Sequence, residues 1–147
     1  MMPLPNSKTS WTADRVVLIE DTRELQCKAP NLVALRTKDG VASLSDLVRS
    51  SLRLQPDRIP VGEVRGAEAS DLLKAWGTGH PGGIGTIHAG SSIGTLRRLE
   101  QLIQEAVVSA PRALIAETIN VIAVLAGAAP NGSWLRRSPD LCQSRRR

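Results

Sequence analysis

The sequence predicts an α/β fold in which a mostly parallel sheet is flanked by helices. Short apolar runs rich in β-branched residues alternate along the chain with segments whose apolar residues recur at helical spacing, a pattern typical of parallel α/β architecture. The length of 147 residues is enough for one domain with a buried core. No apolar run reaches the roughly 20 residues that a membrane-spanning helix needs.

The first strand is predicted at residues 16–19, Val-Val-Leu-Ile, because a continuous apolar run is typical of a strand buried on both faces. It ends in Glu20 and Asp21, which places two carboxylates at the carboxyl end of the strand. Residues 31–36 form a second, weaker strand candidate. The prolines and the lack of periodicity before these strands predict an irregular amino-terminal arm over residues 1–14.

A helix is predicted after the second strand. Ser43, followed by Asp46 three positions later, has the spacing of a capping box, and apolar residues continue from there at helical spacing. Pro56 ends this helix, because the residue before a proline disfavours the helical conformation. Residues 58–61 are a third strand candidate, although Pro60 cannot donate a hydrogen bond within a sheet.

The middle of the chain predicts another helix and strand. Gly66 is expected to cap a helix whose apolar face comes from residues 69–76. Residues 77–83 contain four glycines and predict a loop, in which glycine allows the backbone to approach a ligand closely. This loop leads into a short strand at residues 84–88.

The last predicted elements are a long amphipathic helix over residues 93–107, a short helix opened by Pro111, and a strand at residues 119–125. The folded core is therefore expected to span residues 15–127. Residues 128–147 have no periodicity and predict a disordered basic tail. A shifted reading frame is one hypothesis for the composition of this tail.

The formal net charge of +5 is located mainly in the tail. Residues 133–147 contain five arginines and one aspartate, a net charge of +4, which leaves +1 for the other 132 residues. The chain also has three Trp, no Tyr and no Phe, so it offers few aromatic platforms for base stacking. We therefore expect no direct nucleic-acid binding by the core. Nucleic-acid binding through the basic tail is one alternative function for this chain.

The cysteines and histidines do not predict a structural metal site. Cys27 and Cys142 are too few for a disulfide framework and belong to no C-x-x-C pair. His80 and His88 supply only two nitrogen ligands, whereas zinc sites use three or four protein ligands. A hydrogen-bonding or phosphate-sensing role suits these histidines better.

Three polar clusters lie at predicted strand ends: residues 20–24, residues 62–66, and His80 with His88. Because ligands of open α/β sheets bind at the carboxyl ends of the strands, these clusters are expected to converge on one crevice. Carboxylates, arginines and histidines gathered there are suited to acid–base and phosphate chemistry. The alternative is that each cluster is an ordinary set of solvated loop residues.

These clusters belong to three longer motifs: VVLIEDTREL at residues 16–25, PDRIPVGEVRGAEA at residues 56–69 and GTGHPGGIGTIHAGS at residues 77–91. In this order they resemble the Asp box, the Walker B motif and the His box of the secretion traffic ATPases, in particular the TrbB-type conjugal-transfer ATPases of type IV secretion. The resemblance covers residues 16–125. It implies a RecA-like core of the P-loop NTPase class.

The resemblance also implies a biological role. Proteins of this family couple ATP hydrolysis to DNA or protein transfer or to pilus assembly. They work as cytoplasmic hexameric rings, peripheral to the inner membrane, together with other proteins of the secretion or conjugation system. ATP and Mg²⁺ are the cofactors that the resemblance implies.

Catalytic roles follow from the same resemblance. Glu63 corresponds to the Walker B glutamate, which orients or activates water. Glu20 and Asp21 correspond to the Asp-box carboxylates, which would help to hold the nucleotide's metal ion through water.

Four further residues are implied as nucleotide or phosphate contacts. Arg23 and Arg65 are candidates to contact a phosphate or a neighbouring subunit. His88 would sense the γ-phosphate end of the site, and His80 is a second candidate of the same kind.

One family motif does not occur in this sequence. The Walker A loop, G-x-x-x-x-G-K-[ST], cradles phosphates with its backbone amides, and the nearest imitation here, Lys8-Thr9, has no glycine before it. The sequence therefore predicts an incomplete core, a fragment of such an ATPase that is inactive by itself. The alternative function is a non-enzymatic assembly module that binds to, or inhibits, rings of the full-length ATPase.

Overall fold

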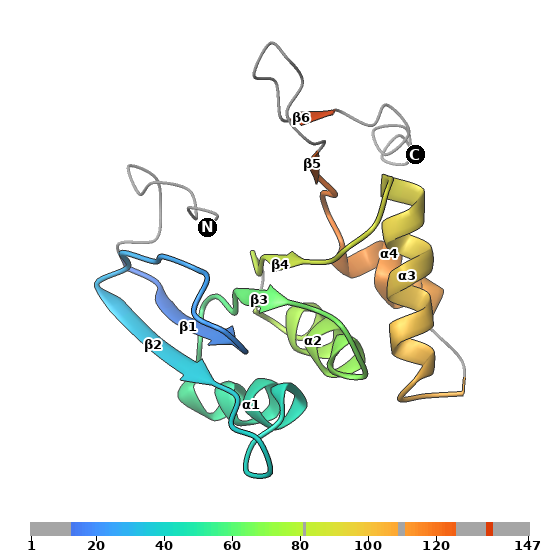
Figure 1. The fold of residues 1–147 in the computed structure, drawn as a ribbon. Helices are drawn as coiled ribbons and strands as arrows, with labels where there is room; N and C mark the ends of the chain where they lie inside the picture. Colours follow the sequence, from blue (N-terminus) through green and yellow to red (C-terminus); the bar gives the residue numbers. More distant parts are fainter. Residues whose placement is uncertain (1–12, 81, 109–110, 126–134, 137–147) are drawn as a thin grey trace.

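Four strands form a parallel sheet in the order β2-β1-β3-β4 (Figure 1). The computed structural model describes residues 13–80, 82–108, 111–125 and 135–136. The strands are β1 (Arg15–Glu20), β2 (Asn31–Arg36), β3 (Val61–Glu63) and β4 (Gly85–Thr86). The predicted α/β class with a mostly parallel sheet is confirmed.

The first two predicted strands are both confirmed. β1 and β2 pair over six residues, from Arg15 opposite Asn31 to Glu20 opposite Arg36. Val16, Val17, Leu18, Ile19 and Glu20 are all buried, as expected for a strand covered on both faces.

The third strand begins later than predicted. Arg58 forms only an isolated bridge to Val16, and the strand itself runs from Val61 to Glu63. The carbonyl of Pro60 accepts a hydrogen bond from the backbone N–H of Ile19, at 2.9 Å. Because proline has no N–H to donate in return, the regular ladder is established only beyond it.

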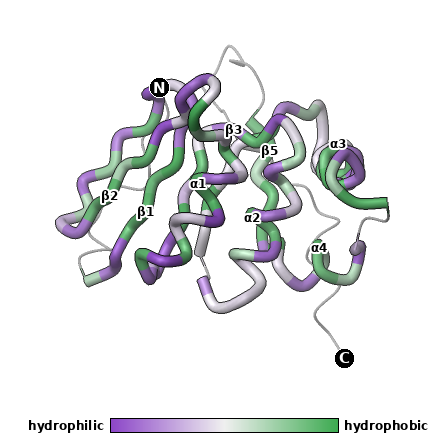
Figure 2. The backbone as a smooth tube through the Cα atoms, turned by 90° about the horizontal axis from the view of Figure 1, so that it is seen from below, coloured by the Kyte–Doolittle hydropathy of each residue, from purple (hydrophilic) through white to green (hydrophobic). Residues whose placement is uncertain are grey.

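Two helices pack side by side against the sheet (Figures 1 and 2). The first, α1 (Leu44–Ser51), begins at the predicted capping box, in which Ser43 and Asp46 each accept a hydrogen bond from the other's backbone N–H. The second, α2 (Glu68–Gly77), begins two residues after the predicted cap at Gly66, and Ala67 occupies the N-cap position without a side-chain hydrogen bond. Gly66 instead donates its N–H to the Glu68 carboxylate, at 2.8 Å.

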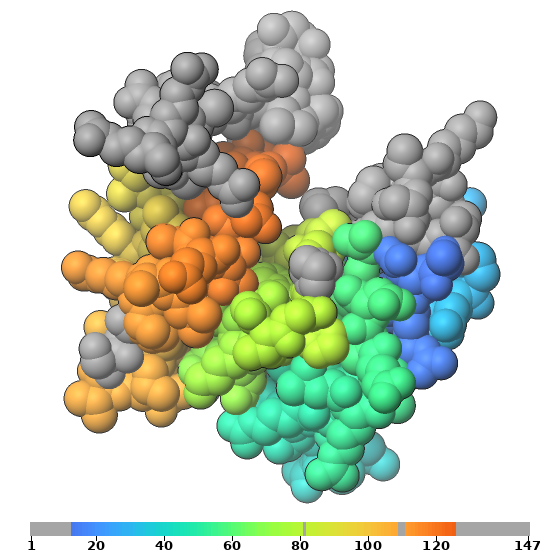
Figure 3. Space-filling model, turned by 180° about the vertical axis from the view of Figure 1, so that it is seen from behind, coloured from blue at the N-terminus to red at the C-terminus, as the bar shows by residue number. Residues whose placement is uncertain are grey.

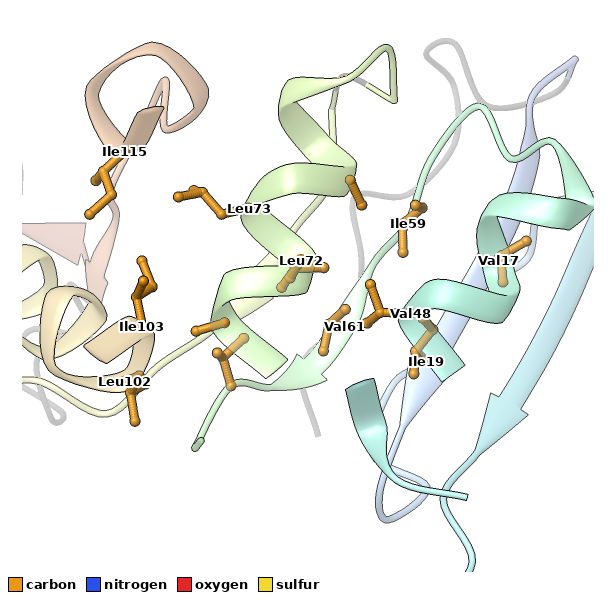
Figure 4. Packing of buried hydrophobic residues seen from close by; sticks show 13 residues of the cluster. Val17, Ile19, Val48, Ile59, Val61, Leu72, Leu73, Leu102, Ile103 and Ile115 are labelled. Carbon is orange, nitrogen blue, oxygen red and sulfur yellow. The ribbon is translucent and has the colours of Figure 1, made fainter. Parts of the chain in front are cut away.

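The remaining helices, α3 (Ser92–Gln104) and α4 (Arg112–Thr118), pack against α2 on the side away from α1. From the opposite side of the molecule, α4 is visible in orange directly beside the end of α2 in yellow-green (Figure 3). One apolar cluster joins the sheet to all four α-helices (Figure 4), and a short 3-10 helix, η1 (Leu52–Leu54), follows α1 directly. Its members include Val17, Ile19, Val61, Val48, Leu72, Leu73, Leu102, Ile103 and Ile115.

The last predicted strand differs most from expectation. Only Val124–Leu125 of the predicted residues 119–125 form a strand, β5, and it pairs antiparallel with β6 (Leu135–Arg136) rather than joining the parallel sheet. An apolar run favours a strand but does not specify its partner, which explains the error. β6 lies within the predicted tail, and the rest of residues 128–147 lies outside the described residues. Of the predicted arm over residues 1–14, only residues 13 and 14 are described. The boundaries of the arm and of the tail therefore stay predictions.

Candidate functional site

A series of polar contacts crosses the carboxyl ends of all four parallel strands, in sheet order. Thr37, directly after β2, donates from Oγ1 to Oδ1 of Asp21, which follows β1. Nη2 of Arg65, in the turn after β3, donates to Oδ2 of the same aspartate. The Arg65 Nε lies 3.5 Å from Oε2 of Glu63, the last residue of β3, and Nε2 of His88, beyond β4, lies 3.2 Å from Oε1 of that glutamate. We call these five residues the edge network.

The edge network confirms that each of the three predicted clusters has a member at one edge. Asp21 follows β1, Glu63 and Arg65 lie at the end of β3, and His88 follows β4, and parallel pairing brings these three strand ends together. Thr37 is a member that the sequence analysis missed. Its position immediately after a predicted strand is the signal that would have identified it.

The electrostatics of the network centre on its two carboxylates. Glu63 has 23% of its side chain exposed and faces a nitrogen atom with each oxygen. The hydroxyl of Thr37, followed by the hydrogen bond and charge of Arg65, lowers the pKa of Asp21 below its ordinary value. Arg65 is half-exposed and His88 almost fully exposed, so the nitrogen-bearing partners of the two carboxylates lie on the solvent side.

Glu20 is buried and contacts other residues than those of the edge network. Its carboxylate is buried, and Oε1 accepts hydrogen bonds from the backbone N–H groups of Glu24 at 3.0 Å and Leu25 at 2.6 Å. Oε2 lies 4.0 Å from Nε of Arg36. The side chain is therefore turned into the loop that follows β1 rather than outward beside Asp21.

Besides Glu20, two predicted site residues are not part of the edge network. Arg23 is exposed in the bend after β1. The Nδ1 of His80 lies 2.6 Å from the carbonyl oxygen of Pro56, which precedes β3 and so lies at the amino end of the sheet. The expectation that His80 and His88 form one cluster is therefore wrong, because β4 runs between them and carries the chain from one edge to the other.

The glycine-rich segment before β4 packs on its own chain. A Cβ atom at Gly83 would lie 2.0 Å from Nε1 of Trp76, which donates to the carbonyl of Ile59 at 3.0 Å. Gly82 has φ +79°, and a Cβ there would lie 1.9 Å from Nη1 of Arg58. These glycines are needed for contact with an indole and a guanidinium, which gives them a role other than the ligand approach expected from the sequence.

Glu68 is a second residue that the sequence analysis did not single out as part of this edge. Its Oε1 accepts the backbone N–H groups of Arg65 at 2.7 Å and Gly66 at 2.8 Å. These bonds fix the turn after β3 and thereby the backbone from which Arg65 reaches the two carboxylates.

The described residues contain no group of three or more His, Cys, Asp or Glu side chains arranged to hold a metal ion. A nucleotide-bound Mg²⁺ has smaller needs, since it retains several waters and takes one or two carboxylates along with phosphate oxygens. The partly exposed carboxylates of Asp21 and Glu63 fit such a role. Glu20 fits it poorly because one of its oxygens already accepts two backbone hydrogen bonds.

Comparison with known proteins identifies relatives over most of the chain. The family model described as type II/IV secretion system protein matches residues 7–128. The probable conjugal transfer protein TrbB of Sinorhizobium fredii is 49% identical over 133 residues, which cover 90% of this chain and 39% of that protein. The conjugal transfer protein TrbB of Rhizobium radiobacter is 51% identical over 114 residues, covering 78% of this chain and 35% of that protein.

Solved structures agree with the sequence comparisons. The VirB11 ATPase of the Brucella suis type IV secretion system, in complex with sulphate, superposes with a TM-score of 0.75 at 30% identity, over 86% of this chain and 39% of that one. The ATPase DotB of Legionella pneumophila gives a TM-score of 0.60 at 31% identity, over 76% of this chain and 32% of that one. The likeness to VirB11 confirms a partial RecA-like fold. The chain spans about two fifths or less of the length of these proteins, and no described helix is both long and apolar enough to cross a bilayer.

Proposed function

The chain belongs to the family of type II/IV secretion system proteins, and from this premise we propose that it forms the water-activating edge of the nucleotide site of a conjugal-transfer ATPase. The observation that carries the proposal is the position of Glu63. Its carboxylate ends a buried strand and lies between Arg65 and His88. A half-buried carboxylate at this edge is suited to orient a water molecule and accept its proton.

Arg65 supplies the positive charge that phosphoryl transfer requires. Its guanidinium contacts Asp21 and Glu63 and is half-exposed, so it can turn toward a phosphate oxygen without leaving the edge. Neutralising charge on the transferred phosphoryl group is the main catalytic task in such reactions. We propose that His88 contacts the γ-phosphate end of the nucleotide, since it is exposed beside Glu63. Arg23 is proposed as a second phosphate or intersubunit contact.

ATP and Mg²⁺ are the proposed cofactors. A magnesium ion bound with the nucleotide would neutralise phosphate charge, and Asp21 and Glu63 would hold it through waters of its coordination shell. Asp21 is suited to this task because its side chain is partly exposed at this edge, and the contacts with Thr37 and Arg65 that lower its pKa favour its ionised form.

The sequence contains no G-x-x-x-x-G-K-[ST] loop, so a phosphate-binding loop from another segment would complete the site. We propose that this chain by itself hydrolyses ATP negligibly. In the complete assembly it would work in a hexameric ring, cytoplasmic and peripheral to the inner membrane, with other proteins of a transfer system. The names of its relatives, conjugal transfer protein and type IV secretion system protein, support that setting.

A chimera tests the proposal. Residues 15–125 would replace the matching segment of the Rhizobium radiobacter TrbB protein, which is 51% identical, and ATP hydrolysis would be measured with and without Mg²⁺. We expect Mg²⁺-dependent turnover, and a loss of about 100-fold or more in the Glu63→Gln variant, the size typical of removing a general base. The Glu117→Gln variant, at an exposed position in α4, is the matched control. A chimera that folds but has the same turnover with and without Glu63→Gln contradicts the proposal.

A non-enzymatic assembly module is the second candidate function. The observation that favours it is β4, the outermost strand on one side of the sheet. Among the described residues β4 pairs only with β3, so the backbone groups on its other side are available to pair with another strand. Such a module would join a ring of full-length ATPases or inhibit it. Mixing the chain with full-length TrbB protein and measuring ring size and ATPase rate tests this candidate, and an unchanged size and rate would contradict it.

A further inference from the structure

Glu20 is a buried carboxylate to which the mechanism proposed above gives no direct chemical step. It is the last residue of β1 and only 1% of it is exposed. A buried charge is tolerated when hydrogen bonds compensate for its lost hydration, and bonds from backbone N–H groups to a carboxylate are among the stronger ones. Glu20 has two such bonds, to Glu24 and Leu25.

These two bonds close the loop of residues 21–24. At one end, Glu20 is fixed by the β1 strand, and at the other, Leu25 is 8% exposed and so anchored by its side chain. The Glu20 carboxylate joins the two ends across the loop. We therefore expect the loop to keep a single conformation only when the side chain at position 20 is a hydrogen-bond acceptor.

The shape of the loop decides where Asp21 points. Asp21 is the first residue beyond Glu20, and its two oxygens face Thr37 on one side and Arg65 on the other. Arg65 in turn contacts Glu63. A change in the loop backbone would therefore reach Glu63 through two successive side-chain contacts.

We propose that Glu20 is a positioning residue: its carboxylate, acting as a hydrogen-bond acceptor, sets the loop that aims Asp21 at Arg65 and thereby places Arg65 against Glu63. The effect on nucleotide chemistry rests on the proposed function, whereas the effect on the loop does not. Glu20 does not act as a metal ligand here, because Oε1 is occupied by two backbone donors and Oε2 faces Arg36.

The Glu20→Gln and Glu20→Ala variants separate these roles. Glutamine keeps a carbonyl oxygen that accepts both N–H groups, and its amide nitrogen would face Arg36, which is half-exposed and free to turn toward solvent. Alanine removes the acceptor altogether. A residue that acts as an acceptor is replaced well by glutamine, whereas a residue that acts through its charge on a metal ion is not.

The first experiment uses the 147-residue chain and NMR, with no nucleotide. In Glu20→Ala we expect the backbone amides of Glu24 and Leu25 to exchange about tenfold faster or more, because their acceptor is lost. In Glu20→Gln we expect the exchange of both amides to stay close to that of the unchanged chain. If Glu20→Ala does not fold, the Gln variant decides alone. Faster exchange of these amides in Glu20→Gln overturns the proposal, as does unchanged exchange in Glu20→Ala.

The second experiment places the same variants in the chimera and measures kcat. We expect kcat of the Glu20→Gln chimera to be at least about tenfold higher than kcat of the Glu20→Ala chimera. The Mg²⁺ dependence of the Gln variant should match that of the unchanged chimera. Equal losses in both variants would make Glu20 a charged ligand and overturn the proposal. If the unchanged chimera is inactive, the proposed function fails, and the NMR measurements still decide the role of Glu20.

Discussion

Arg65 donates a hydrogen bond to Asp21 across 44 positions of sequence and so ties the loop after β1 to the turn after β3. The same guanidinium lies against Glu63. An anion that binds Arg65 must therefore compete with two carboxylates of the chain itself. Under the proposed function, this competition would give the edge network two states: one in which Arg65 contacts Asp21 and Glu63, and one in which Arg65 contacts a phosphate.

Thr37→Val is predicted to raise the pKa of Asp21. The Thr37 hydroxyl is the largest of the causes that lower this pKa, ahead of Arg65, so its removal brings the pKa back toward the ordinary value. Because the pKa of Asp21 is lowered in the folded state, its ionised carboxylate stabilises that state. This stabilisation is complete at pH values above the ordinary aspartate pKa, and it is lost as the pH falls through the folded-state pKa. The stability difference between Thr37→Val and the unchanged chain should therefore narrow with acidification over that range.

The measurement is an NMR pH titration of the Asp21 carboxyl carbon, with urea unfolding at several pH values. Thr22→Val is the matched control, since Thr22 is exposed next to Asp21. We expect the control to leave the titration in place. An unchanged pKa in Thr37→Val would contradict the contact between Thr37 and Asp21.

Ser43→Ala is predicted to destabilise the fold by about 1 kcal/mol, the usual cost of losing an N-cap side chain. The Ser43 hydroxyl accepts the backbone N–H of Asp46 at 3.2 Å and begins α1. The Ser43 side chain, then its backbone N–H, lowers the pKa of Asp46, so this pKa should rise in the variant. Urea unfolding and an Asp46 titration check both effects; Ser50→Ala, exposed in the same helix, should change neither.

The correct sequence predictions depend on short-range information. The capping box at Ser43 and Asp46 and the apolar run of β1 each specify an element within a few residues, and both are present as predicted. The strand ends that carry Asp21 and Glu63 also follow from such runs. Because parallel strands align their carboxyl ends, local patterns were sufficient to predict that these residues lie together.

The errors concern contacts between distant segments. Nothing local to residues 119–125 indicates that Val124–Leu125 pair with Leu135–Arg136. His80 and His88 are close in sequence, yet β4 separates them across the sheet. The loop-facing direction of Glu20 depends on backbone N–H groups whose positions only the folded loop defines.

His80→Ala is predicted to lower stability by about 1 kcal/mol, because the ring nitrogen that donates to the Pro56 carbonyl is lost. His88→Ala is the comparison: this side chain is 93% exposed, and its loss should change stability by less than about 0.5 kcal/mol. Urea unfolding of both variants measures the difference. Equal effects would contradict the placement of the two histidines at opposite edges.

Gly83→Ala and Gly62→Ala make the same chemical change with opposite predicted results. A Cβ atom at Gly83 would meet the Trp76 indole at 2.0 Å, so the ring must move and its hydrogen bond to Ile59 is strained; we expect a loss of about 1–3 kcal/mol, as for other overpacked sites. At Gly62 the nearest atoms, in Glu20, lie 3.8 Å away, an ordinary contact. Gly62→Ala should be neutral or stabilise slightly, because alanine reduces the freedom of the unfolded chain.

Urea unfolding measures both variants, and Trp76 fluorescence is a second signal when Trp11 and Trp134 are replaced by phenylalanine in every chain compared. We expect the spectrum to change in Gly83→Ala alone, because only there does the new methyl group displace the indole. A neutral Gly83→Ala with an unchanged spectrum would mean that the segment before β4 does not lie on Trp76. In that case the glycines of this segment would be free to serve a ligand, as their sequence pattern alone suggests.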